Sequence, residues 1–244
     1  MSTNKIALII AMSMTIIYMG LKLSGFDNFD LGYKVITVAA GVYAALSALT
    51  KAAKSGDKGI IFVGGLGLGL LAVSEIYYLA HILFAFKTEA EMDVGDLSDT
   101  AAALFFLAAI LLLLLLPPRW EKTLRIWSGI FAVVVTLTIT YSIVRNDFVM
   151  GSIAAMVMGG VITLLSVILI YQIQKIPQLE KAGCFAFAML YFGVVDIVSY
   201  YFYSLGAVEI AQLLFALYMP AYIWINEGLA RMDEARPERR GCDG

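Results

Sequence analysis

The sequence predicts an all-α polytopic membrane protein with eight transmembrane helices. Of its 244 residues, 61% are hydrophobic and only 15% are charged, whereas soluble domains average about 45–50% apolar and about 25% charged residues. Such a chain has too few polar side chains to cover a water-soluble surface. Long apolar segments recur throughout, so we expect no separate soluble domain.

Eight apolar segments are each long enough to cross a hydrocarbon core of about 30 Å, which takes roughly 20 helical residues. We interpret the first as a retained helix, since no clear signal-peptide cleavage site follows it. Pro177 ends the sixth, because proline cannot donate the hydrogen bond that continues a helix. Seven spans are the alternative, if two short segments form a re-entrant pair. The expected spans are residues 5–24, 31–53, 59–86, 97–116, 123–144, 149–172, 183–204 and 207–229.

The distribution of basic residues predicts the orientation of these spans. Thirteen of the 17 lysines and arginines lie in the chain ends and in the second, fourth and sixth connections. The other four, Lys22, Lys34, Lys87 and Arg145, lie on the opposite side and complete the 17. Basic loops stay in the cytoplasm, so we expect both termini to be cytoplasmic, in a protein of the plasma (cell) membrane.

Weak internal similarity predicts that the spans form two four-helix halves. Residues 41–47 resemble residues 160–166, and Glu75-Ile76 resembles Asp196-Ile197 about the same distance further along the chain. Each half would begin on the cytoplasmic side, which makes the repeat a parallel one. Chance similarity between apolar helices is the alternative. The expected units are a first half at 1–118, a second half at 119–230 and a short polar tail at 231–244.

Carboxylates inside apolar spans are the main indication of a functional site. Glu75 and Asp196 each interrupt a long apolar run, and a charge in hydrocarbon is costly unless pairing or function compensates for it. Oxygen-rich sites suit protons, Na⁺ and divalent cations, so these two acids are candidate cation or proton carriers. The structural alternative is that each binds a neighbouring hydroxyl and fixes helix packing.

A shallower carboxylate accompanies each deep one. Asp99 and Glu209 correspond in the repeat, each at the start of a span, and all four carboxylates could surround a vestibule that faces outward. Negative charge is also favoured at a helix N-terminus by the helix dipole. Capping is therefore the alternative role of Asp99 and Glu209.

Four further polar residues are candidates for a ligand or ion pathway. His81, the only histidine, follows Glu75 by six residues, which places it about 120° away around the helix. It can relay a proton or simply lie at the membrane interface. Tyr78, Ser199 and Tyr200 add hydroxyls close to the two deep carboxylates, although interfacial belts are also rich in tyrosine.

Two backbone features qualify this interpretation. Gly65 and Gly69 form a GxxxG spacing that favours close helix packing, and no Gly-Lys-Ser/Thr follows that would indicate a phosphate loop. Pro220 lies inside the last span and predicts a kink, because it removes a helical hydrogen-bond donor.

These observations favour a transport protein, a carrier or channel linked to a small cation or to protons. A membrane sensory or assembly module acting through a partner protein is the first alternative, and an intramembrane lipid-modifying enzyme using paired acids is the second. The net charge of −2 gives no reason to expect nucleic acid. We expect no cofactor, since the two cysteines have no metal-ligand spacing, and the involvement of a metal stays undecided. Besides the bilayer and the cation, a second copy or another membrane protein is an expected partner.

Overall fold

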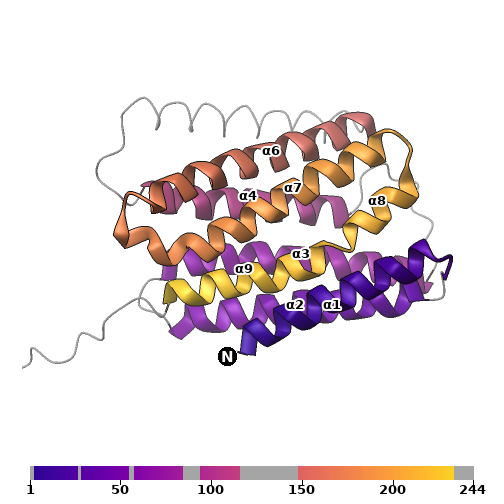
Figure 1. The fold of residues 1–244 in the computed structure, drawn as a ribbon, viewed down its shortest axis with the longest axis horizontal. Helices are drawn as coiled ribbons and strands as arrows, with labels where there is room; N and C mark the ends of the chain where they lie inside the picture. The colour runs from indigo at the N-terminus through magenta and orange to yellow at the C-terminus, as the bar shows by residue number, and fades with distance from the viewer. Residues whose placement is uncertain (1–2, 27–28, 55–57, 85–93, 116–147, 234–244) are drawn as a thin grey trace, which may run out of the picture.

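The computed structural model describes residues 3–26, 29–54, 58–84, 94–115 and 148–233, and every regular element in these ranges is helical (Figure 1). The helices before residue 148 are α1 (Thr3–Leu23), α2 (Asp30–Lys54), α3 (Lys58–Phe84) and α4 (Val94–Leu115). Those after it are α6 (Phe148–Ile173), the 3₁₀ helix η2 (Pro177–Ala182), α7 (Gly183–Ser204), α8 (Val208–Phe215) and α9 (Tyr218–Asp233).

Seven candidate membrane spans lie within the described residues, each long and apolar enough to cross a bilayer. The prediction of an all-helical chain with several helices able to cross a membrane is therefore confirmed for the described residues. Seven of the expected spans match these helices, with α8 and α9 together forming the last one. The expected span at 123–144 lies outside the described residues, so the eighth span and the repeat stay predictions. Of the expected tail at 231–244, residues 234–244 also lie outside the described residues.

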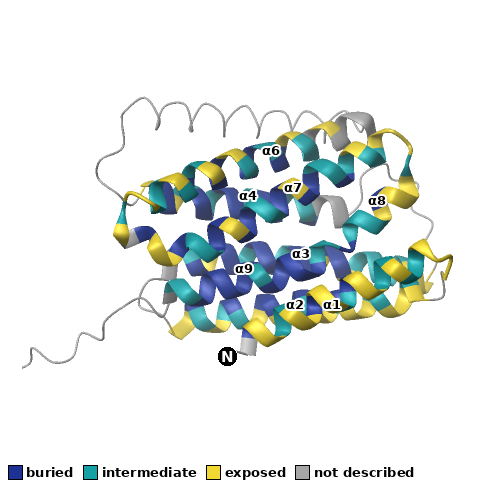
Figure 2. Ribbon diagram, in the orientation of Figure 1, coloured by how far each residue is buried: buried dark blue, intermediate teal, exposed yellow. Residues whose placement is uncertain are grey.

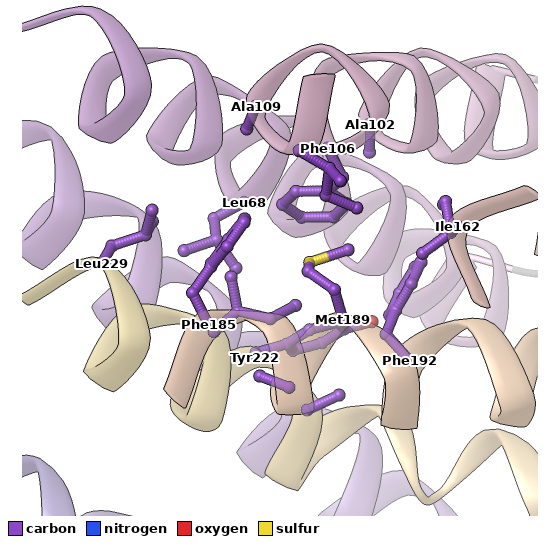
Figure 3. Packing of buried hydrophobic residues seen from close by; sticks show 14 of the residues in the cluster. Leu68, Ala102, Phe106, Ala109, Ile162, Phe185, Met189, Phe192, Tyr222 and Leu229 are labelled. Atoms are coloured by element: carbon purple, nitrogen blue, oxygen red, sulfur yellow. The ribbon is translucent and has the colours of Figure 1, made fainter. Parts of the chain in front are cut away.

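Helix α3 lies at the centre of the bundle. It packs against α2 on one side and α4 on the other, while α9 lies against α2, α3 and α7 (Figure 1). Helix α7 packs along α6 and also contacts α8. The buried residues lie on the inward sides of α2, α3, α4, α6, α7 and α9 (Figure 2). In this core, Phe106 of α4 and Phe192 of α7 meet edge to face at 5.4 Å (Figure 3).

Helix α1 lies at the edge of the bundle and packs mainly on α9. Its outward side is apolar, with Ile16 70% exposed and Ile17 61% exposed. An apolar exposed face would be unfavourable in water but suits contact with lipid chains. The burial pattern thus agrees with the membrane assignment.

The glycines of α3 allow three neighbouring helices to approach it. A Cβ atom at Gly64 would lie 2.8 Å from Leu229 of α9, and one at Gly67 would lie 2.7 Å from Phe106 of α4. A Cβ atom at Gly65 would meet Leu49 of α2 at 3.1 Å, whereas Gly69 faces open space. The expectation of close packing is therefore right for Gly65, but Gly69 does not take part. The close contacts of α3 with its neighbours are therefore made at Gly64, Gly65 and Gly67, each of which faces a different helix. They are not made along one helix face defined by the GxxxG spacing.

The last span is broken into two helices, α8 and α9, at residues 216–217. Pro220 explains the break, since it has no N–H to donate to the carbonyl of Ala216 four residues earlier. Tyr33 of α2 donates a hydrogen bond of 2.7 Å to that carbonyl, and Tyr191 of α7 donates one of 3.2 Å to the carbonyl of Leu217. The predicted kink is thus a full interruption, whose exposed backbone acceptors are satisfied by tyrosines of neighbouring helices, as apolar surroundings require.

The packing of α9 on α7 predicts a specific sensitivity to substitution. A Cβ atom at Gly228 would lie 2.5 Å from the Cα atom of Phe185, a backbone atom that cannot move aside on its own. We expect Gly228→Ala to lower the free energy of unfolding by about 1–3 kcal/mol, the usual cost of overpacking. Denaturant titration of the purified protein in bicelles measures this change.

Gly160→Ala is the matched control, because a Cβ atom there meets nothing within 4 Å. Its effect should stay within about 0.5 kcal/mol. Equal stability of the Gly228→Ala and Gly160→Ala proteins would contradict the close contact between α7 and α9.

Candidate functional site

Both deep carboxylates lie in the interior of the bundle. Glu75 of α3 is 7% exposed and Asp196 of α7 is 8% exposed. They come from different helices, and both bind side chains of α9. A carboxylate at such a position needs hydrogen-bond donors or a cation, because neither lipid nor apolar side chains offer any replacement for water.

Glu75 has a partner on each carboxylate oxygen. Tyr222 of α9 donates a hydrogen bond of 2.7 Å to Oε1, and Lys34 of α2 forms an ion pair with Oε2. The Lys34 ammonium also lies 5.2 Å from the ring centre of Tyr78, a position suited to a cation–π interaction. The charge of Glu75 is thus balanced within the protein.

Asp196 has a tyrosine partner but no ion pair among the described residues. Tyr218 of α9 donates a hydrogen bond to Oδ1 of Asp196. Tyr218 and Tyr222 are one helical turn apart, and their rings stack with centres 6.3 Å apart and planes 8° from parallel. Helix α9 therefore connects the two carboxylates through adjacent tyrosines. We call Lys34, Glu75, Tyr222, Tyr218 and Asp196 the polar network.

The polar stripe of α9 continues beyond the polar network. Asn226 follows Tyr222 by one turn, is fully buried, and has no hydrogen-bond partner for either amide atom among the described residues. Tyr218, Tyr222 and Asn226 recur every fourth residue, which places them along one side of a helix. Farther along, Arg231 donates a 3.0 Å hydrogen bond to Glu227, an ordinary pair at i,i+4 spacing.

The two shallow carboxylates lie in different surroundings. Asp99 of α4 is half-buried and close enough to Tyr218 and Tyr222 to interact with them electrostatically. Glu209 is exposed in the first turn of α8. The structure thus brings three of the four predicted carboxylates around the tyrosines of α9, and it places Glu209 at the surface.

The other predicted pathway residues are distributed around this centre. His81 is half-buried and packs against the ring of Tyr77, with ring centres 4.5 Å apart. Ser199 is fully buried on α7, and its hydroxyl has no hydrogen-bond partner among the described residues. Tyr200 packs edge to face on Phe215 of α8 at 5.7 Å. Tyr78 contributes its ring beneath Lys34, as described above.

Lys34, Tyr218 and Tyr222 belong to the polar network but are not among the pathway residues predicted above, although Tyr218 and Tyr222 are two of the many tyrosines of the last two spans that could line a polar path near Asp196. In the charge distribution, Lys34 counts only as a basic residue on the outer side. Its position, four residues inside α2, was the available signal, because a lysine within an apolar span needs a partner. The i,i+4 spacing of Tyr218 and Tyr222 around Pro220 was a second signal, obscured by the many other tyrosines of the last two spans.

Within the described ranges, no group of three or more histidine, cysteine, aspartate or glutamate side chains is arranged to hold a metal ion.

Comparison of the chain with protein-family models, with curated proteins and with solved structures found no match.

The ion pair of Lys34 with Glu75 predicts that loss of one partner makes the other destabilise the fold. Lys34→Met leaves a buried carboxylate without its cation, and we expect a loss of roughly 1–3 kcal/mol in the free energy of unfolding. This is less than the cost of breaking a fully buried ion pair, because Lys34 is partly exposed. Denaturant titration in bicelles measures the loss.

The double variant Lys34→Met/Glu75→Gln removes both charges and serves as the control. We expect it to be more stable than Lys34→Met alone, since no unpaired charge remains. Additive effects of the two substitutions would show that the two charges do not interact.

Proposed function

We propose that this protein is a membrane transport protein, a carrier or channel for a small cation or for protons. The observation that supports the proposal best is the polar network. Two carboxylates from separate helices lie buried in the bundle and connect through stacked tyrosines of α9. Intramembrane acids that face the interior of a helical bundle are typical of ion pathways and proton relays.

The break in the last span supports the same proposal. Discontinuous helices often form the binding sites of transporters, since their interruption leaves backbone groups and helix ends close to the ligand. Here α9 begins at Tyr218, the residue that binds Asp196. The break therefore lies beside one of the two carboxylates.

The break also provides a hinge. Helix α8 follows the turn at Gly206, whose φ of 75° favours glycine, and it packs on α7. The carbonyls of Ala216 and Leu217 each accept a hydrogen bond from a tyrosine hydroxyl, and that of Ala216 also accepts one of 3.4 Å from the N–H of Met219. Movement of α8 would change its packing on α7 and these hydrogen bonds, while α9 could stay packed in the core.

We further propose the arrangement in which such a transporter would operate. The two halves at 1–118 and 119–230 would be related by a parallel repeat. Both termini would be cytoplasmic in the cell membrane, following the excess of basic residues on that side. A second copy of the chain or another membrane protein remains a proposed partner.

Proteoliposomes test this proposal directly. We expect liposomes with the purified protein to take up ²²Na⁺, or to change the fluorescence of an entrapped pH-sensitive dye, under an imposed membrane potential or pH gradient. Glu75→Gln and Asp196→Asn should lower this flux by about 10²-fold, the lower range for removal of a positioned proton-transfer group.

Glu180→Gln is the matched control, because Glu180 is exposed on η2 and should leave the flux unchanged. The proposal fails if the protein moves neither ion faster than empty liposomes. It also fails if Glu75→Gln and Asp196→Asn both transport like the unsubstituted protein.

A further inference from the structure

Helix α2 extends past the beginning of α1 (Figure 1). The hydroxyl of Tyr43 donates a hydrogen bond of 2.8 Å to Oδ1 of Asn4, which lies in the first turn of α1. From Tyr43, α2 continues for about three more turns to Lys54, so α1 leaves one side of these turns uncovered. We call Leu46, Ser47, Thr50, Lys51 and Lys54 the α2 ledge. Together with Tyr43, they line one shallow depression of the surface.

The α2 ledge changes from apolar to basic along its length. Leu46 is 62% exposed and lies farthest from the end of the helix. Ser47 and Thr50 add two hydroxyls, and Lys51 and Lys54 add two ammonium groups in the last turn. The spacings of three and four residues place all five side chains on one side of the helix, over a length of about 12 Å.

This change of polarity matches the depth that the α2 ledge would have in a bilayer. Helix α2 begins at Asp30, and a hydrocarbon core of about 30 Å takes roughly 20 helical residues. The boundary of the hydrocarbon would therefore come close to Thr50. Leu46 would lie among acyl chains, whereas Lys51 and Lys54 would lie among lipid headgroups, on the side where the excess of basic residues predicts the cytoplasm.

The basic end of the α2 ledge also has a charge that an anion can balance. Residues 50–58 contain three lysines and one aspartate, an excess of positive charge. At the opposite end of the bundle, Lys22 and Lys34 each form an ion pair with a carboxylate. No carboxylate of the described residues forms an ion pair with Lys54. Anionic lipids of the cytoplasmic leaflet attract lysines at this depth.

We propose that the α2 ledge binds one anionic phospholipid of the cytoplasmic leaflet. The lipid phosphate would lie at Lys51 and Lys54, the ester oxygens would accept hydrogen bonds from Ser47 and Thr50, and an acyl chain would lie along Leu46. A zwitterionic lipid has the same chains, but its own ammonium group is repelled by the two lysines. This inference depends on the membrane character of the chain and does not depend on the proposed transport.

Native mass spectrometry of the full chain tests the site without requiring transport. The purified protein, freed of lipid in detergent, is titrated with phosphatidylglycerol or with phosphatidylcholine that carries the same acyl chains. A lysine near an anionic headgroup raises the affinity about fivefold. With two lysines, the first molecule of phosphatidylglycerol should bind about 30-fold more tightly than the first molecule of phosphatidylcholine.

Substitutions locate the bound lipid. Lys51→Gln/Lys54→Gln should abolish the preference for phosphatidylglycerol, and Thr50→Val should weaken the binding of both lipids about two- to fivefold, as expected for one lost hydrogen bond. Lys175→Gln/Lys181→Gln is the matched control. It removes the same charge from two exposed lysines on the same predicted side of the membrane, and it should keep the preference.

Equal affinity of the unsubstituted protein for the two lipids overturns the site. So does an equal loss of preference in the two double variants, since net charge alone would then attract the lipid. Inorganic phosphate should not displace the lipid, because it makes no contact with Leu46, and displacement would show a phosphate site in place of a lipid site. A protein that prefers phosphatidylglycerol but moves no ion in proteoliposomes keeps this site and refutes the proposed function.

Discussion

Helix α9 satisfies two buried carboxylates at once, and the centre of the bundle depends on this. Tyr222 holds Glu75 of α3, and Tyr218, one turn earlier, holds Asp196 of α7. In hydrocarbon no water replaces a missing donor, so each acid must find its partners inside the protein. The two hydrogen bonds therefore fix the rotation of α9 about its axis and its position between α3 and α7. Lys34 adds α2 to the same arrangement through its ion pair with Glu75.

The interruption of the last span makes this position of α9 attainable. An unbroken helix from 208 to 233 would keep α8 and α9 on one axis, whereas the break at 216–217 allows each to follow its own neighbours. Tyr33 and Tyr191 stabilise the break, because their hydroxyls donate hydrogen bonds to the carbonyls of Ala216 and Leu217. Tyr33 of α2, Tyr191 of α7, and Tyr218 and Tyr222 of α9 thus provide polar contacts at the centre of the bundle.

Seven of the long apolar helices could be predicted from the sequence, as could the apolar surroundings of the two carboxylates, because each depends on composition along one segment. Glu75 and Asp196 stand out as single charges in apolar runs. Their partners could not be derived in this way, since contact between Lys34 and Glu75 depends on how α2 rotates against α3. The GxxxG pattern did not predict the close contacts at Gly64 and Gly67 for the same reason. These contacts depend on which neighbouring helix faces each glycine.

Tyr218 and Tyr222 connect the two carboxylates, and a double-substitution cycle on Glu75→Gln and Asp196→Asn measures the strength of this connection. The free energies of unfolding of the four proteins in bicelles give the coupling. If Tyr218 and Tyr222 join the two acids in one network, the coupling should be about 0.5 kcal/mol or more, as for residues that share partners. Additive effects within experimental error would mean that the two carboxylates are independent and that Tyr218 and Tyr222 do not couple them.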